Sequence, residues 1–149
     1  AGLSRGVAGK RTWWKRGELL GGGSFGRVWA GVHKDTGQFL AVKEVPLSSD
    51  TDSEFQAVAQ EVNIMKSLSH PNIVAYHGTE LDDENKVLYI FMEYVSGGSL
   101  AGLIESFTFL DEPLARRITK EMLEGLAYLH SCNVVHRDVK PGNVLIDET

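Results

Sequence analysis

The sequence is poor in cysteine and in long apolar runs. Cys132 is the single cysteine among 149 residues, so no disulfide can form within the chain. No apolar run is long enough to cross a bilayer, and no stretch has the pattern of a secretory signal peptide. We therefore expect no membrane span. Because a chain without disulfides suits a reducing compartment, we also expect a cytoplasmic location.

Acidic residues are absent from the first 16 positions, which hold five of the bases. The rest of the chain carries 20 acids and 10 bases and is therefore acidic. This balance argues against a nucleic-acid-binding protein. Residues 1–12, which include three glycines, are interpreted as a basic flexible tail. The apolar fraction of 42% is enough for a packed core in the remainder.

An acid, a lysine and an amide lie close together near the end of the sequence, in the run His136–Asn143, H-R-D-V-K-P-G-N. Phosphoryl transfer needs positioning and charge neutralisation, and these side chains can supply both. Asp138 would accept or orient the proton of an attacking hydroxyl, Lys140 would add positive charge, and Asn143 would bind Mg²⁺. A basic surface turn is the alternative. It is disfavoured because the run departs from the pattern H-R-D-L-x-x-x-N only at Val139.

Residues 21–28 read G-x-G-x-x-G-x-V, a glycine pattern with two interpretations. A dinucleotide-binding loop would require a helix to begin at the third glycine. Instead, Val28, Ala30 and Val32 alternate with other residues, which is typical of a strand. A turn at 35–37 and a returning strand over 39–45 complete a predicted strand–loop–strand unit after a first strand over 14–20. Glycines here would let backbone N–H groups approach phosphate oxygens that a Cβ would block.

A lysine and a glutamate are predicted to pair across two elements. Lys43 ends the run L-A-V-K on the returning strand, and a buried lysine needs a carboxylate partner. Residues 54–68 are predicted to form a helix, and Glu61 on it is the best candidate to face Lys43. The alternative is that Glu61 is a solvated helix carboxylate. The apolar face of this helix is predicted to hold Phe55, Val58, Val62, Met65 and Leu68.

The remaining elements follow from the same periodicities. Strands are predicted over 73–77 and 86–93, joined by a loop over 81–85, and a third over 144–146. A short helix is predicted over 100–106 with Ser99 as its cap, and a longer one from Asp111 to about Cys132. The glycine pair in 96–99 would suit a hinge.

Taken together, these motifs make the chain from Trp14 to Thr149 resemble the eukaryotic serine/threonine protein kinases. Residues 14–21, 23–28 and 92–100 are most similar to the mitogen-activated protein kinase kinase kinases, although Pro141 and Gly142 depart from the Lys-Gly-Ala-Asn that this group often carries. The implied fold class is α+β. A sheet lobe over 13–95 and a hinge over 96–99 would precede the beginning of a helical lobe over 100–149. Because no D-F-G follows, we expect a fragment that is inactive by itself.

The resemblance implies a site that binds ATP and Mg²⁺. It also implies a protein substrate with a serine or threonine acceptor, such as a downstream kinase. The catalytic residues would be Asp138, Lys140 and Asn143, with Asn143 also the metal ligand. The ATP-binding residues would be Gly21, Gly22, Gly23, Ser24, Phe25, Gly26, Val28, Ala41, Lys43, Glu61, Met92, Glu93, Val95 and Leu145.

Two other functions are compatible with parts of the sequence. One is a pseudokinase or nucleotide-binding regulatory module. It is disfavoured by the presence of all five expected residues, Lys43, Glu61, Asp138, Lys140 and Asn143. The other is a truncated kinase-like interaction protein that binds partners through the apolar positions of residues 114–129.

Overall fold

The computed structural model describes residues 13–23, 26–47 and 52–147, and the side chains of 52–55 are not among those described. The chain divides into two compact units. The sheet unit comprises Ala1–Leu68 and Ala75–Tyr94, and the helical unit comprises Ser69–Val74 and Val95–Thr149. The predicted tail over 1–12, the loop residues Ser24 and Phe25, and the side chain of Phe55 lie outside the described residues.

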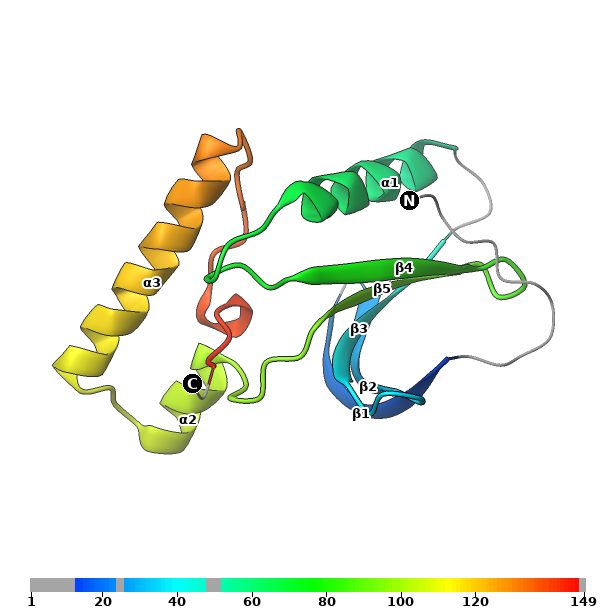
Figure 1. The fold of residues 1–149 in the computed structure, drawn as a ribbon. Coiled ribbons are helices and arrows are strands. Elements are labelled where there is room, and N and C mark those ends of the chain that lie inside the picture. The colour runs from blue at the N-terminus through cyan, green and yellow to red at the C-terminus, as the bar shows by residue number, and fades with distance from the viewer. Residues whose placement is uncertain (1–12, 24–25, 48–51, 148–149) are drawn as a thin grey trace. The chain divides into compact units, whose positions relative to one another are not determined.

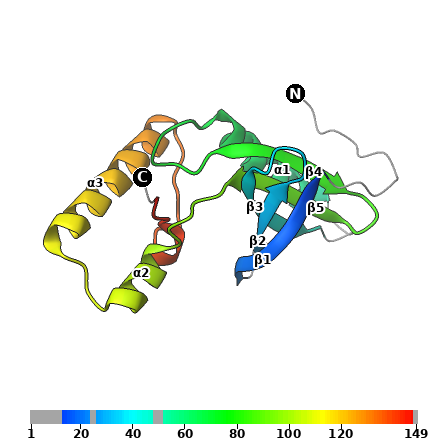
Figure 2. The same cartoon turned by 60° about the horizontal axis from the view of Figure 1, so that its bottom comes forward.

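Five strands of the sheet unit form one antiparallel sheet in the order β1-β2-β3-β5-β4 (Figure 1). The strands are β1 (Trp14–Gly23), β2 (Gly26–His33), β3 (Phe39–Pro46), β4 (Tyr76–Asp82) and β5 (Val87–Glu93). The predicted pair of strands flanking the glycines is therefore present as β1 and β2, which lie side by side in Figure 2. Helix α1 (Asp52–Ser67) lies along one face of the sheet, where it is seen in Figure 1.

The two faces of the sheet carry separate apolar clusters, because side chains alternate between faces along a strand. On the α1 face, Val62 packs with Leu88 and Ile90, and Val58 and Met65 lie against them, as the helical periodicity predicts. On the opposite face, the buried side chains of Trp14, Leu40, Val42 and Phe91 pack together. The sheet unit thus has its own core on both sides.

The predicted bounds of β4 are wrong. The strand begins at Tyr76 instead of 73 and continues to Asp82, which lies within the predicted loop. At the end of this strand, the Asp82 carboxylate accepts hydrogen bonds from the backbone and side-chain N–H groups of Asn85, at 3.0 and 2.7 Å. These bonds stabilise a tight turn that includes Lys86 with φ of 52°, so that the strand can pair up to Asp82.

The helical unit contains α2 (Leu100–Phe107), α3 (Glu112–Ser131) and a 3₁₀ turn at Pro141–Asn143. Ser99 caps α2 as predicted, because its Oγ accepts a hydrogen bond from the N–H of Gly102. Asp111 precedes α3 without a side-chain cap bond. None of the helices in the described residues has both the length and the apolar character needed to cross a membrane.

Residues 69–74 pack against α3 inside the helical unit. The Ser69 N–H donates to the Tyr128 hydroxyl oxygen at 2.8 Å, and the His70 and Tyr128 rings stack with centroids 4.9 Å apart. The His70 Nδ1 accepts a hydrogen bond from the Asn72 N–H, which closes a turn. This turn is the physical reason why no strand starts at residue 73.

The prediction of a strand over 144–146 is also wrong, because only Leu145 forms a bridge there. Leu145 makes one isolated antiparallel bridge, with Ser99. Two backbone hydrogen bonds flank it: Leu100 N–H donates to the Val144 carbonyl at 2.7 Å, and Ile146 N–H to the Gly98 carbonyl at 2.9 Å. The segment is extended, but a short helix begins at Leu100 and ends the pairing.

Candidate active site

Gly21 and Gly23, at the end of the β1–β2 hairpin, lack the packing reasons that usually explain glycine, whereas Gly26 has one. A Cβ added at Gly21 or Gly23 would meet no described atom within 4 Å. At Gly26, with φ of 114°, a Cβ would collide with the backbone carbonyl oxygen of Glu44, so only glycine fits. The backbone at Gly21 and Gly23 therefore leaves room that a ligand could fill. Ser24 and Phe25, predicted to contribute here, lie outside the described residues.

Lys43 and Glu61 face each other inside the sheet unit, as predicted. Lys43 lies on β3 and Glu61 on α1, and their Nζ and Oε1 atoms are 3.5 Å apart. The Lys43 side chain is only 25% exposed, whereas that of Glu61 is 57% exposed. An ammonium group has three N–H donors, so the ion pair leaves donors on Lys43 for anionic oxygens. This arrangement could hold phosphates.

Three predicted adenine-site residues of the sheet unit lie next to this lysine in the ladder. Val28 pairs with Lys43 across β2 and β3, and Ala41 pairs with Met92 across β3 and β5. Ala41 is buried, and Met92 is half-buried against the α1-face cluster. Because residues two apart on a strand share a face, Ala41 and Lys43 lie on the same side of β3.

Glu93 is held by two contacts with Ala75 that the sequence did not predict. The Glu93 N–H donates to the Ala75 carbonyl at 2.9 Å, and the Glu93 Oε2 accepts from the Ala75 N–H at 3.0 Å. The Glu93 N–H is therefore occupied by the protein itself. A role for the Glu93 backbone in binding adenine is accordingly restricted to its carbonyl.

The catalytic-loop residues of the helical unit converge as the motif predicts. The Asn143 side-chain N–H donates to both the carbonyl and the Oδ2 of Asp138, at 2.8 and 2.9 Å. The Lys140 Nζ lies 3.4 Å from the same Oδ2. Arg137, with φ of 69°, takes a left-handed backbone conformation that is uncommon for a non-glycine residue. The loop therefore directs Asp138, Lys140 and Asn143 to one place.

These contacts favour the ionised form of the Asp138 carboxylate. The hydrogen bond from Asn143, followed by the one from Lys140, lowers the pKa of Asp138 below its ordinary value of 3.8, and the positive charges of Lys140 and His136 act in the same direction. The Asp138 side chain is also exposed, so a ligand could reach its carboxylate.

The residues present also fit a magnesium ion. Mg²⁺ prefers oxygen ligands, and the Asp138–Asn143 pair offers carboxylate and amide oxygens. No cluster of three or more His, Cys, Asp or Glu side chains suited to a metal occurs in the part of the chain that the structure describes. An ion here would therefore need further oxygens from a bound phosphate and from water, which is how Mg²⁺ is usually held.

The other predicted nucleotide contacts of the helical unit are Val95 and Leu145. Val95 is half-buried at the start of the segment after β5, and the side chain of Leu145 is exposed next to its bridge with Ser99. Nothing in either environment tests a role in binding, so both stay predictions.

Comparison with known proteins identifies the family. A protein kinase domain model matches residues 14–149. Mitogen-activated protein kinase kinase kinase 3 of Arabidopsis thaliana is 43% identical over 90% of this chain, and the match spans 22% of that relative. The kinase kinase kinase YODA of the same plant is 45% identical, with 90% of this chain and 15% of YODA covered. SSK2, a MAP kinase kinase kinase of Saccharomyces cerevisiae, is 44% identical over 90% of this chain and 8% of its own length.

The family match confirms the predicted α+β fold of the protein kinases and the similarity to the kinase kinase kinases. The chain spans less than a quarter of the length of each of these relatives.

Proposed function

Because the chain belongs to the protein kinase family, we propose that it transfers the γ-phosphate of ATP to serine and threonine hydroxyls of a protein substrate. The observation that carries this proposal is the convergence of Asp138, Lys140 and Asn143, in which an ionised carboxylate is held between an amide and an ammonium group. A surface turn would have no need for this arrangement.

In this proposal the sheet unit holds the nucleotide. The Lys43 ammonium, fixed by Glu61, binds the α- and β-phosphates, and the backbone N–H groups of Gly21–Gly26 bind phosphate oxygens. Val28 and Ala41 enclose the adenine, Met92 forms the wall behind it, and the Glu93 carbonyl accepts a hydrogen bond from its amino group. The resemblance to kinases also assigns Val95 and Leu145 of the helical unit to nucleotide binding.

The chemistry depends on Asp138. Its carboxylate accepts or orients the proton of the substrate hydroxyl, so that the oxygen can attack the γ-phosphorus while the bond to the β-phosphate oxygen breaks. Lys140 stabilises negative charge on the transferring group. Mg²⁺, bound by Asn143, would neutralise phosphate charge during transfer.

We further propose a place in a mitogen-activated protein kinase cascade, with a downstream protein kinase as substrate. The names of the relatives support this, since each is a kinase that acts two steps above a MAP kinase. The proposed domain division has a sheet lobe over 13–95, a hinge over 96–99 and the beginning of a helical lobe over 100–149. The single cysteine supports a cytoplasmic location.

The test is transfer of labelled phosphate. The full-length protein, with ATP and Mg²⁺, should phosphorylate an inactivated MAP kinase kinase, and mass spectrometry should locate the phosphate on serine or threonine. A matched substrate with alanine at those positions is the control. Binding of ATP without any transfer would instead support a nucleotide-binding regulatory module, and phosphate on tyrosine alone would contradict the proposed substrate class.

A further inference from the structure

Glu44 is a buried carboxylate that the proposed reaction does not use. It is 7% exposed and is the one charged residue among the buried side chains of the described chain. It lies on β3 directly after Lys43, and because strand side chains alternate, it points to the opposite face of the sheet. A buried carboxylate is costly unless it is paired and hydrogen-bonded. Glu44 must therefore have partners.

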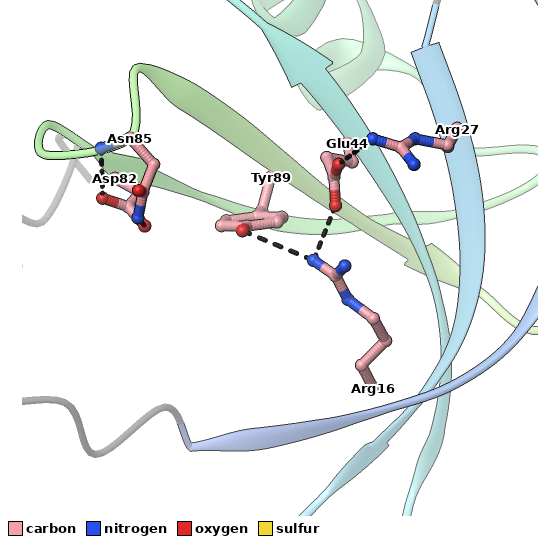
Figure 3. Close-up of polar contacts among 6 residues, drawn as sticks. All are labelled: Arg16, Arg27, Glu44, Asp82, Asn85 and Tyr89. Atoms are coloured by element: carbon pink, nitrogen blue, oxygen red, sulfur yellow. Dashed lines mark hydrogen bonds and ion pairs between the residues drawn. The ribbon is translucent and has the colours of Figure 1, made fainter.

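Two arginines from the glycine-rich hairpin supply these partners (Figure 3). Arg16 on β1 places its Nη2 2.6 Å from the Glu44 Oε2, and Arg27 on β2 places its Nη2 3.3 Å from Oε1. Arg16 Nη2 also lies 3.5 Å from the Tyr89 hydroxyl oxygen on β5. Each carboxylate oxygen of Glu44 thus binds a different strand of the hairpin.

The two guanidinium groups are held in place by an indole ring. Arg16 lies 4.6 Å from the centroid of a Trp29 ring, and Arg27 lies 5.8 Å from it. Both distances are within the range of cation–π attraction. The ring therefore helps to orient both arginine side chains, which lowers the entropy cost of the contact relative to an ordinary surface ion pair.

The contact of Glu44 with the two arginines lies at the end of the pairing between β2 and β3. The β2–β3 ladder ends at the pair Arg27 and Glu44, next to the pair Val28 and Lys43. The β1–β2 ladder continues further, to the pair Gly23 and Gly26. The glycine-rich end of the hairpin therefore projects past the last pairing with β3, and the Arg16–Glu44–Arg27 cluster lies where it leaves the sheet.

We propose that Glu44 is a positioning residue for the nucleotide. By joining both strands of the hairpin to β3, it sets the orientation of the glycine-rich turn relative to Lys43, on the other face of the same strand. This inference rests on the proposed function, since it assumes that the hairpin and Lys43 bind one ATP molecule.

The substitution Glu44→Gln tests the proposal, because it keeps the shape of the side chain and removes its charge. In the full-length protein we expect KM for ATP to rise about tenfold, because a hairpin that is held less firmly is in its ATP-binding orientation for a smaller fraction of the time. We expect kcat to stay within about twofold, because the catalytic loop is unchanged. Amide hydrogen exchange without nucleotide should become faster over residues 14–33. A purely structural role would lower the folded fraction and leave KM unchanged.

The matched control is Glu121→Gln, the same change at a helix carboxylate that accepts from Arg117 at 3.1 Å. It should alter neither KM nor hairpin exchange. If Glu44→Gln fails to fold, Arg27→Met, at a more exposed position, should still raise KM for ATP. An active Glu44→Gln enzyme with KM within twofold of wild type would overturn the proposal. If the wild type transfers no phosphate, the proposed function fails, and hydrogen exchange of the hairpin alone then tests the role of Glu44. Equal exchange in the wild type and in Glu44→Gln would overturn that role. Faster exchange in the variant would support it.

Discussion

Among the residues that the structure describes, eight of the ten buried apolar side chains lie in the sheet unit, whereas nine of the 13 exposed large apolar side chains lie in the helical unit. In the described part of the helical unit, Ile118 and Leu129 alone are in the buried apolar group. The sheet unit can therefore fix its functional groups by packing. The helical unit has to rely on local backbone geometry and hydrogen bonds.

The functional residues follow the same division. Lys43 is 25% exposed and lies on the α1 face of the sheet, in register with the buried Ile90. Asp138 and Lys140, in contrast, are 57% and 58% exposed, and their placement comes from hydrogen bonds within residues 136–143. We infer that a substitution in the sheet core can weaken nucleotide binding without contacting the nucleotide. In the helical unit, a substitution should affect phosphate transfer only when it falls within the catalytic loop.

The largest effect on the sheet side should come from Lys43→Met. The variant keeps an unbranched side chain of similar length, so it should fold, but phosphate transfer should fall by about 10²–10³, as for loss of one fixed electrostatic group. Rates of labelled phosphate transfer by the full-length protein measure this. Lys120→Met on the exposed face of α3 is the control and should be near wild type. Near-normal transfer by Lys43→Met would remove Lys43 from the site.

A matched pair of leucines tests the packing contrast directly. Leu88 in the sheet unit is 4% exposed, and Leu123 on α3 is 56% exposed. Leu88→Ala should lower the free energy of unfolding by about 2–5 kcal/mol, because it leaves a cavity. Leu123→Ala should change it by about 0.5 kcal/mol or less. Urea denaturation measures both. Equal losses would mean that Leu123 has a packing partner and that the contrast is wrong.

A smaller effect is expected from Met92→Gly, which opens the half-buried position opposite Ala41. Bulky N6-substituted ATP analogues should inhibit this variant about tenfold better than wild type, a difference of about 1.4 kcal/mol. Competition assays against ATP measure the change. Should the analogues inhibit both proteins equally, Met92 does not form the pocket wall. Glu93→Gln, which keeps an oxygen to accept from the Ala75 N–H, is the control and should bind ATP normally.

The smallest expected effect is a change in the pKa of Asp138. Asn143→Ala removes the main cause of its lowered pKa, so the pKa should rise toward 3.8. Because the folded-state pKa is depressed, the ionised carboxylate favours folding above its unfolded-state pKa, and this contribution is lost as pH falls through the folded-state value. Carboxyl NMR titration measures the shift, with Asn85→Ala as control. An unchanged midpoint in Asn143→Ala would show that the hydrogen bond has no electrostatic effect.

Much of the sheet could be predicted because its signals are local. Alternation at Val28, Ala30 and Val32 indicated β2, and the lysine motif led to the Lys43–Glu61 pair. Strand β4 was misplaced because its ends depend on side-chain hydrogen bonds of His70 and Asp82 that periodicity does not encode.

The contact of Glu44 with the two arginines was not predicted from the sequence, for a different reason. Its partners Arg16 and Arg27 lie 28 and 17 residues away, and no short motif joins them. A signal was nevertheless present: Leu40, Val42 and Glu44 occupy one face of β3, and a glutamate in line with two buried apolar residues needs a cation. The strand pairing seen in the structure was needed to identify Arg16 and Arg27 as the cations.

The central claim is that this domain catalyses phosphoryl transfer through Asp138. The most direct measurement is single-turnover transfer of labelled γ-phosphate by the full-length protein and its Asp138→Asn variant, with ATP affinity measured in parallel. We expect the rate to fall by about 10²–10⁴, the range for loss of a general base, with ATP affinity unchanged. Transfer by Asp138→Asn at the wild-type rate would contradict the account.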